Sequence, residues 1–229
     1  MTTDPTGATD LAALLRSLRV WDPEITELPP FDPATAPADP LALFTAWFAD
    51  AVTAGQPEPH TLSLATSDAS GLPDVRTVML HGADREGWSF ATHATSAKGR
   101  QLTDRPYAAL GFYWPVLGRQ VRVRGPVTSA PAAESAADLH ARSTGALAAA
   151  LTGHQSEVLT SYDDLERASR AAWERARREP DAPVPTWTLY RVRADAVEFF
   201  QGDGERRHVR VRYRRGEGGA DWVRELLWP

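Results

Sequence analysis

The stretch GFYWPVLGRQVRVRGPV, residues 111–127, decides the fold. Gln120, Arg122 and Arg124 lie two positions apart in it, so a β-strand would place all three side chains on one face. ALGFYW, residues 109–114, has the composition of a second strand. We therefore expect an antiparallel strand pair at the centre of this chain.

A hydrophobic period of two continues on both sides of this pair, in short segments separated by turns rich in Gly, Pro, Ser and Asp. The other predicted strands lie in TLSLAT, RTVMLH, GWSFAT, WTLYRVR, AVEFFQ, RHVRVRYR and DWVRELLW, between residues 61 and 228. Helices are predicted over residues 41–54, after Thr95 or Ser96, over 131–151 with an interruption at Gly145, and from a capping box at Ser161 to about Arg178. The fold class is α+β, a mostly antiparallel β structure closing towards a barrel, with flanking helices.

The N-terminal 40 residues differ from the rest. Residues 1–9 are predicted to be disordered, and a short amphipathic helix follows with Asp10 as its N-cap. Six prolines between Trp21 and Pro40 predict an arm without regular structure that lies over another surface, as in arms that complete a dimer. We expect a helix and proline-rich arm over residues 1–40 and one domain over 41–229.

The composition excludes several classes of protein. The chain has 229 residues, 25 basic and 30 acidic, and its formal charge of −5 argues against a nucleic-acid partner. It contains no cysteine, no basic leader with an apolar core and no run of 18 apolar residues, so we expect a cytoplasmic protein that does not enter a membrane. His93, His140 and His154 have no metal-ligand spacing, and no metal site is predicted.

RRHVRVRYRR, residues 206–215, holds six arginines and one histidine. In a strand, Arg206, His208, Arg210, Arg212 and Arg214 would share one face, with Val209, Val211 and Tyr213 on the other. Alternation alone allows a solvated outer strand or the wall of a pocket for an anion.

A second basic group favours an anion pocket. Arg76 lies on a predicted strand, and Lys98 lies beside a predicted helix start, where free backbone N–H groups attract negative charge. A bidentate arginine, a point-charge lysine and helix-end donors together form a plausible phosphate clamp.

Six segments carry a resemblance to a known family: LATSDASGLPDVRTVMLHG, FATHATSAKGRQL, GFYWPVLGRQVRVRGPV, HQSE, VEFFQGDGERRHVRVRY and ELLWP. In this order, over residues 41–229, they resemble the pyridoxine/pyridoxamine 5'-phosphate oxidases, flavoenzymes built on the FMN-binding split barrel. The resemblance implies FMN as cofactor and a homodimer with the flavin at the subunit interface.

The resemblance also implies which residues contact FMN. The matching positions are Arg76, Thr77, Val78, Met79, Leu80, His81, Ala91, Thr92, Ser96, Lys98, Gln120, Gln155, Ser156, Phe200 and Arg210. Of these, the arginines, Thr92, Lys98, Gln120, Gln155 and Ser156 keep the family's residue. We therefore expect FMN binding to be retained.

The substrate side is altered. Where the family holds the vitamin's phosphate with a lysine, a tyrosine, an arginine and a serine, this chain has His81, Asp138, Arg142 and Ala146. Asp138 would face an incoming phosphate with like charge. Arg206 and His208, which the resemblance places over the flavin as catalytic and substrate-binding residues, are both present.

The leading hypothesis is an FMN-dependent oxidase that transfers a hydride from its substrate to flavin N5, with O₂ as acceptor. Its substrate would be unphosphorylated and phenazine-like, or another secondary metabolite, because THATSAKGR and HQSEVL resemble the phenazine-biosynthesis branch of the family. One alternative is a genuine pyridoxine/pyridoxamine 5'-phosphate oxidase. Another is a split barrel that binds flavin or haem without catalysis.

Overall fold

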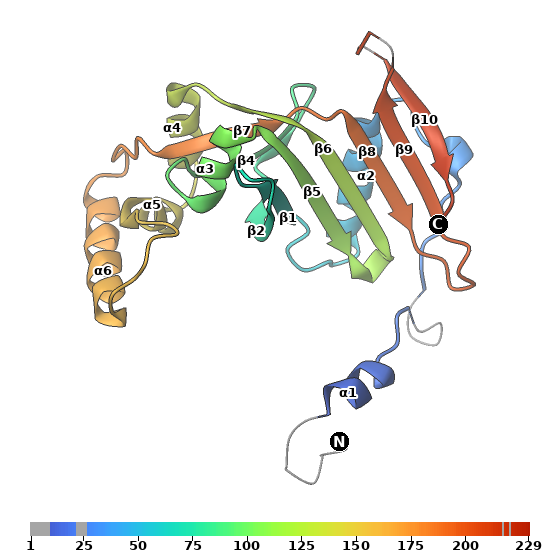
Figure 1. The fold of residues 1–229 in the computed structure, drawn as a ribbon, viewed down its shortest axis with the longest axis horizontal. Coiled ribbons are helices and arrows are strands. Elements are labelled where there is room, and N and C mark those ends of the chain that lie inside the picture. Colours follow the sequence, from blue (N-terminus) through green and yellow to red (C-terminus); the bar gives the residue numbers. More distant parts are fainter. Residues whose placement is uncertain (1–9, 22–26, 217, 220) are drawn as a thin grey trace.

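The computed structural model describes residues 10–21, 27–216, 218–219 and 221–229, so the predicted disorder of residues 1–9 lies outside the described part (Figure 1). The strands are β1 (Thr61–Ser67), β2 (Pro73–Met79), β3 (Gly82–Ala83), β4 (Trp88–His93), β5 (Tyr107–Trp114), β6 (Arg119–Ser129), β7 (Trp187–Val192), β8 (Ala196–Gln201), β9 (Val209–Arg215) and β10 (Trp222–Leu227). The helices are α1 (Leu11–Ser17), α2 (Pro40–Thr53), α3 (Ala97–Asp104), α4 (Ala132–His140), α5 (Thr144–Thr152) and α6 (Tyr162–Arg178), with short 3-10 turns at Pro33–Thr35 and Pro115–Leu117.

The strands form one curled antiparallel sheet. Its main path runs β10-β9-β8-β6-β5-β1-β2. The long strand β6 makes the curl possible, because its first half pairs with β8 while Val127–Ser129 pair with β7, which continues to β4 and β3. Gly125 lies where β6 changes partners, and a β-carbon there would come within 1.9 Å of the Arg193 carbonyl oxygen.

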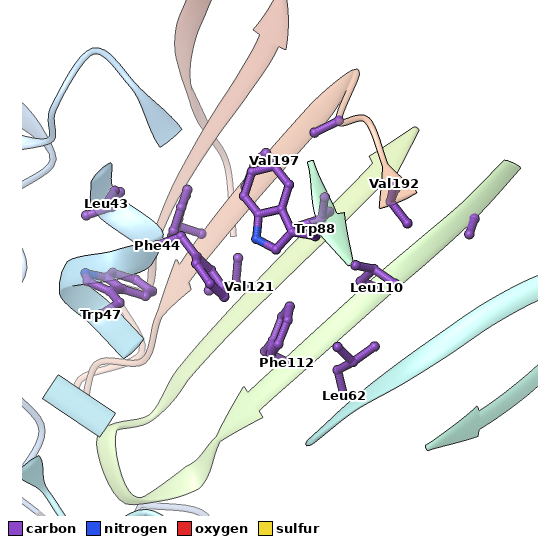
Figure 2. Close-up of a cluster of buried hydrophobic side chains, with 14 of the residues drawn as sticks. Leu43, Phe44, Trp47, Leu62, Trp88, Leu110, Phe112, Val121, Val192 and Val197 are labelled. Carbon is purple, nitrogen blue, oxygen red and sulfur yellow. The ribbon is translucent and has the colours of Figure 1, made fainter. Parts of the chain in front are cut away.

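Helix α2 covers the inner face of this sheet (Figure 2). Asp39 caps its N-terminus by accepting from the Leu41 N–H, and Pro40 occupies the first turn, where its missing N–H costs nothing. Phe44 contacts Phe112 at a centroid distance of 5.1 Å, and Trp47 contacts Phe199 at 5.2 Å, in each case edge to face. The predicted apolar face of residues 41–54 is therefore confirmed as part of the core.

A smaller core lies at the end of the molecule opposite β9 and β10 (Figure 1). Leu139, Leu147 and Ala176 pack there between α4, α5 and α6, with Trp187 alongside. The prediction that Gly145 interrupts the helix is wrong: the break falls between α4 and α5, and Ser143 caps α5. The capping box at Ser161 is confirmed, since the Ser161 hydroxyl accepts from the Asp164 N–H in the first turn of α6.

Two strand boundaries differ from the prediction. β2 begins at Pro73, inside the segment predicted as a turn, because pairing with β1 extends to Ser67. β9 begins only at Val209, because Arg206 adopts a φ of 66°, which an extended strand does not allow. The prediction that Arg206 and His208 belong to the strand face is therefore wrong, since both precede the strand. The Asp10 cap of α1 is confirmed.

Candidate active site

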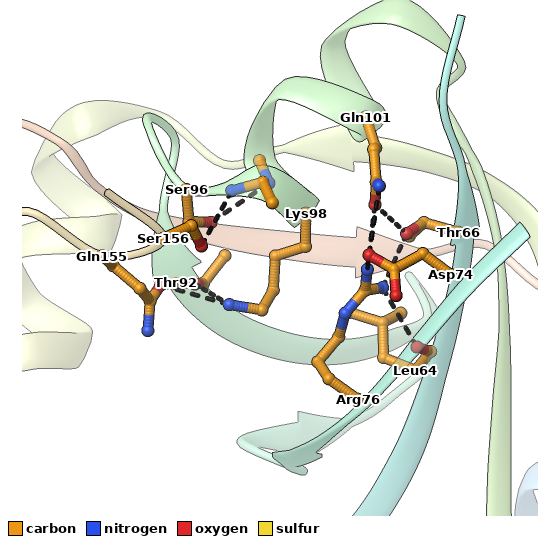
Figure 3. A network of polar contacts seen from close by, with 12 residues as sticks. Leu64, Thr66, Asp74, Arg76, Thr92, Ser96, Lys98, Gln101, Gln155 and Ser156 are labelled. Carbon is orange, nitrogen blue, oxygen red and sulfur yellow. Dashed lines mark hydrogen bonds and ion pairs between the residues drawn. The ribbon is translucent and has the colours of Figure 1, made fainter. Parts of the chain in front are cut away.

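Arg76 and Lys98, from β2 and α3, form with Thr92, Gln155 and Ser156 a group that we call the cationic cluster (Figure 3). The Lys98 Nζ donates to Thr92 Oγ1 and to Gln155 Oε1, both at 3.1 Å. Burial lowers the pKa of Lys98, and the positive charge of Arg76 lowers it further. Two cations are thus held near each other in a half-buried position, which is where an anion such as phosphate binds best.

Neighbouring oxygens orient the Arg76 guanidinium. Nη1 donates to the Leu64 carbonyl at 3.1 Å and to Thr66 Oγ1 at 2.6 Å, while Nη2 donates to Asp74 Oδ2 at 2.6 Å and to Gln101 Oε1 at 2.9 Å. The Arg76 Nε takes no part in these hydrogen bonds. The sequence reasoning missed Asp74 and Gln101, although Asp74 stands two residues before Arg76 on the same strand.

The predicted helix start beside Lys98 exists, but part of its hydrogen-bonding capacity is already used. Ser96 is fully buried and caps α3, because its hydroxyl accepts from the Gly99 N–H at 3.2 Å. The Ala97 N–H donates to Ser156 Oγ at 3.1 Å. Ser156 therefore joins the loop after α5 to the N-terminus of α3.

Gln120, Phe200 and Arg210 lie side by side across β6, β8 and β9, and we call them the outer row. Gln120 pairs in register with Phe200, and Phe200 with Arg210. The three residues line a hollow of about 210 Å³ together with Arg122, Glu198 and Pro229. Its mixture of an aromatic ring, an amide and a guanidinium suits a planar polar ring.

Arg210 has a carboxylate partner that the sequence reasoning missed. Its Nε and Nη2 donate to Glu198 Oε1 at 3.0 and 2.7 Å, and its Nη1 donates to the Trp228 carbonyl at 2.9 Å. Burial alone would raise the pKa of Glu198, but hydrogen bonds from Arg210 and Arg122 outweigh it and hold that pKa below its ordinary value. The sequence signal for this pair was Glu198 itself. It lies on the outer face of β8, between the arginine-bearing strands β6 and β9.

The rest of the basic strand follows the predicted alternation. Val211 and Tyr213 are fully buried in the core. Arg212 and Arg214 on the opposite face each pair with Glu225 of β10 at 2.7 Å. Beyond Arg210, the basic face is therefore a row of surface ion pairs.

The sheet register separates the cationic cluster from the outer row. Arg76 pairs with Leu64, and this row continues through core residues to Tyr213, so Arg76 shares the inner face. Arg210 is three residues from Tyr213 and lies on the outer face. Arg76 and Arg210 are also five strand spacings apart, about 24 Å along the sheet. Within one chain, the two groups belong to opposite faces.

The predicted phosphate-binding positions on the substrate side form a closed ion-pair cluster. His81 Nδ1 lies 3.0 Å from Asp138 Oδ1, and Arg142 donates to the same carboxylate through Nη2 at 2.9 Å and Nε at 3.3 Å. Trp187 Nε1 donates to Asp138 Oδ2 at 3.3 Å. Burial opposes ionisation of Asp138, yet hydrogen bonds from His81 and Arg142 hold its pKa far below the ordinary value.

This cluster changes two expectations. The charge of Asp138 is compensated by Arg142, so an incoming phosphate would meet a site without surplus positive charge rather than a bare carboxylate. The His81 side chain is 5% exposed and turned to Asp138, while Ala146 lies in the first turn of α5 and offers no polar side-chain group.

The two residues predicted over the flavin occupy the turn before β9. Arg206 is exposed. His208 lies with its ring centroid 5.1 Å from that of Phe200, and its Nδ1 accepts from the Asp203 N–H at 3.1 Å. Because Nδ1 is an acceptor, the neutral imidazole carries its proton on Nε2. In this arrangement His208 can donate from Nε2, so it is suited to orienting a substrate.

The other residues predicted to contact FMN alternate between the inner and the outer face of the sheet. Val78 and Leu80 pack against the core, whereas Thr77 and Met79 are exposed on the outer face. Ala91 is half-buried in β4. Within the described residues there is no group of three or more His, Asp or Glu placed to hold a metal ion, and no helix long and apolar enough to cross a membrane.

The chain matches two family models, described as pyridoxamine 5'-phosphate oxidase over residues 48–199 and as the pyridoxine 5'-phosphate oxidase C-terminal dimerisation region over residues 187–229. It is 42% identical over 199 residues to a pyridoxine/pyridoxamine 5'-phosphate oxidase of Pseudomonas fluorescens, covering 86% of this chain and 91% of that one. A Burkholderia ambifaria enzyme of the same name is 41% identical, with 86% and 92% covered.

Solved structures share the fold. PhzG from Burkholderia lata, determined with tetrahydrophenazine-1-carboxylic acid, superposes with a TM-score of 0.81 at 28% identity, covering 88% of this chain and 99% of that one. A pyridoxamine 5'-phosphate oxidase-related, FMN-binding protein from Nostoc punctiforme gives a TM-score of 0.67 at 22% identity, covering 81% and 97%. The fold is therefore the split β-barrel with flanking helices, and the chain belongs to the pyridoxamine 5'-phosphate oxidase family.

Proposed function

We propose that this protein is an FMN-dependent oxidase that works as a homodimer. The cationic cluster of one protomer would hold the FMN phosphate through Arg76 and Lys98, and the outer row of the partner would contact the ring. The opposite faces of the two groups support this division, because one chain cannot bring both to one small ligand. The match to a C-terminal dimerisation region over β7–β10 supports a dimer.

The residues of the cationic cluster fit a phosphate group. Lys98 has a lowered pKa because it is buried next to Arg76, and a dianion would offset the charge of Lys98 and join Asp74 as a counter-charge to Arg76. Bound FMN would supply hydride acceptance at N5 and reoxidation by O₂. Arg210 would stabilise negative charge on the ring, and its ion pair with Glu198 would fix the guanidinium in place.

The substrate that we propose is planar and unphosphorylated, of the phenazine type. The Asp138 cluster carries this proposal, because both Arg142 and His81 are engaged by an internal carboxylate. PhzG, whose structure contains tetrahydrophenazine-1-carboxylic acid, is a structural relative over most of both chains. His208 would orient such a substrate through Nε2–H above the flavin.

A second candidate is pyridoxine/pyridoxamine 5'-phosphate oxidation. The 41–42% identity to curated enzymes of that name over 86% of the chain favours it. In that case Arg142 would have to exchange Asp138 for the substrate phosphate.

Oxygen uptake by the FMN-loaded homodimer separates the two candidates. We expect turnover of a reduced phenazine carboxylic acid and little turnover of pyridoxamine 5'-phosphate. Asp138→Asn keeps the side-chain shape but removes its charge, so this variant should lower the KM for pyridoxamine 5'-phosphate. Efficient turnover of pyridoxamine 5'-phosphate by the unmodified protein would contradict the proposed substrate and favour the second candidate.

A further inference from the structure

Lys98 is the only lysine among the 25 lysine and arginine residues of the chain. An arginine guanidinium keeps its proton in proteins, whereas a lysine amine can lose its proton and then form covalent bonds as a nucleophile. Any covalent chemistry of a side-chain amine in this protein therefore takes place at Lys98. The surroundings of that one amine decide whether it is an inert surface group or a reactive one.

The Lys98 side chain is half-buried among groups that do not neutralise it (Figure 3). Both acceptors of its Nζ, Thr92 Oγ1 and Gln155 Oε1 at 3.1 Å, are uncharged oxygens. In the part of the chain that the structure describes, no carboxylate forms an ion pair with Lys98, and Asp74 pairs with Arg76 at 2.6 Å instead. The charged form of the amine therefore lacks the partner that normally stabilises a buried ammonium group.

The titratable neighbours of Lys98 favour its neutral form on balance. Burial lowers the pKa of Lys98, the positive charge of Arg76 lowers it further, and the charge of Asp74 opposes them less. His93 of β4 is 4% exposed, and burial followed by the charge of Lys98 lowers its pKa, so it is neutral at pH 7. A lysine that is desolvated beside another cation is one of the established forms of an activated amine nucleophile.

We propose that Lys98 is a covalent modification site for aldehydes that carry a phosphate group. Arg76 would hold the phosphate, and the neutral Lys98 amine would attack the carbonyl carbon of the aldehyde. A C–N double bond forms, and the carbonyl oxygen leaves as water with the two protons of the amine. The product is an imine, its formation is reversible by water, and the step needs no oxidant or reductant.

This modification and the cofactor would exclude each other. In the proposed function, Arg76 and Lys98 hold the FMN phosphate, so an aldehyde phosphate on Lys98 would block cofactor loading of an FMN-free protomer. Bound FMN would in turn protect Lys98 from aldehydes. Only this protection rests on the proposed function, because imine formation at Lys98 depends on the chain's own residues and not on oxidase activity.

Borohydride trapping tests the proposal, because it reduces an imine to a stable amine that peptide mass spectrometry can locate. The full-length protein, freed of FMN, is incubated at pH 7 with 4-formylphenyl phosphate or with 4-methoxybenzaldehyde, a matched aldehyde without the charge. Arg76→Ala removes the proposed phosphate partner. The control variant combines Lys98→Arg with Arg178→Lys, which moves the single lysine to a position of α6 where the native side chain is 71% exposed.

We expect one adduct on Lys98, formed about tenfold faster with the phosphate aldehyde than with 4-methoxybenzaldehyde, as for one charge-assisted contact. Arg76→Ala should abolish this preference, and the relocated lysine should show none. Trapping at Lys98 no faster than at the relocated lysine, or an adduct only on the N-terminal amine, would overturn the inference. FMN added first should prevent the adduct. Phosphate-selective trapping at Lys98 that FMN does not slow would support the modification site and contradict the proposed function instead.

Discussion

Asp138→Asn tests whether the ion-pair cluster of His81, Asp138 and Arg142 is a structural element of this chain. The Asp138 side chain is 13% exposed and receives hydrogen bonds from three side chains, those of His81, Arg142 and Trp187. Asparagine retains one acceptor oxygen but leaves the Arg142 guanidinium without a counter-charge. Arg142 is 28% exposed, so it can recover part of its hydration.

The exposed fractions of Asp138 and Arg142 determine how much of the free energy of unfolding the substitution should remove. Removing one partner of a buried pair costs about 3–5 kcal/mol, and the partial exposure of Arg142 favours the lower end, about 3 kcal/mol. For a chain of this size, that corresponds to a fall in Tm of roughly 6–12 °C at fixed protein concentration. Because the pKa of Asp138 is lowered by folding, its contribution is complete above the ordinary aspartate pKa of about 4 and is lost as the pH falls through the lower folded value.

Urea unfolding at pH 7 and at pH 3.5 measures this loss. We expect the difference between Asp138→Asn and the unmodified protein to be full at pH 7 and to shrink at acid pH. Glu179→Gln is the matched control, because its pair with Arg175 is exposed, and it should leave the midpoint unchanged. A change of less than about 1 kcal/mol for Asp138→Asn at pH 7 would refute the reasoning.

Three further results are expected. Lys98→Ala should weaken FMN binding about 10- to 100-fold in a fluorescence titration, as for a lost charge-assisted bond, and unchanged affinity would exclude Lys98 from the phosphate site. FMN affinity should fall at alkaline pH earlier than for an ordinary lysine, because burial and Arg76 lower the pKa of Lys98; a flat profile up to pH 10 would contradict this. Phe44→Ala should lower the free energy of unfolding by about 3–5 kcal/mol in urea, and a loss below about 1 kcal/mol would mean that α2 is not part of the core.

Much of the fold is predictable because its strands have one apolar face. The alternation at Val211 and Tyr213 and the apolar face of α2 place the core without any knowledge of pairing. Strand ends are harder to place, because a backbone conformation such as that of Arg206 has no signature in the side chain. Gly145 was misleading because it fits inside a helix under Trp173.

The site is less predictable, because its contacts join distant segments. His81 and Asp138 are 57 positions apart, and their pairing follows only from the approach of α4 to the end of β2. The opposite faces of Arg76 and Arg210 follow from a register that runs through six strands. The contact of Trp21 with His208, between rings 5.5 Å apart, has no sequence signal.

FMN content of mixed dimers tests the central claim most directly. One parent carries Arg76→Ala and Lys98→Ala, the other Gln120→Ala and Arg210→Ala, and differently tagged copies are co-expressed and purified as the hybrid. If each FMN is bound by the cationic cluster of one protomer and the outer row of its partner, the hybrid has one intact site, and we predict about half the FMN of the unmodified dimer, with almost none in either parent. A hybrid that retains no more FMN than its parents would contradict the shared site.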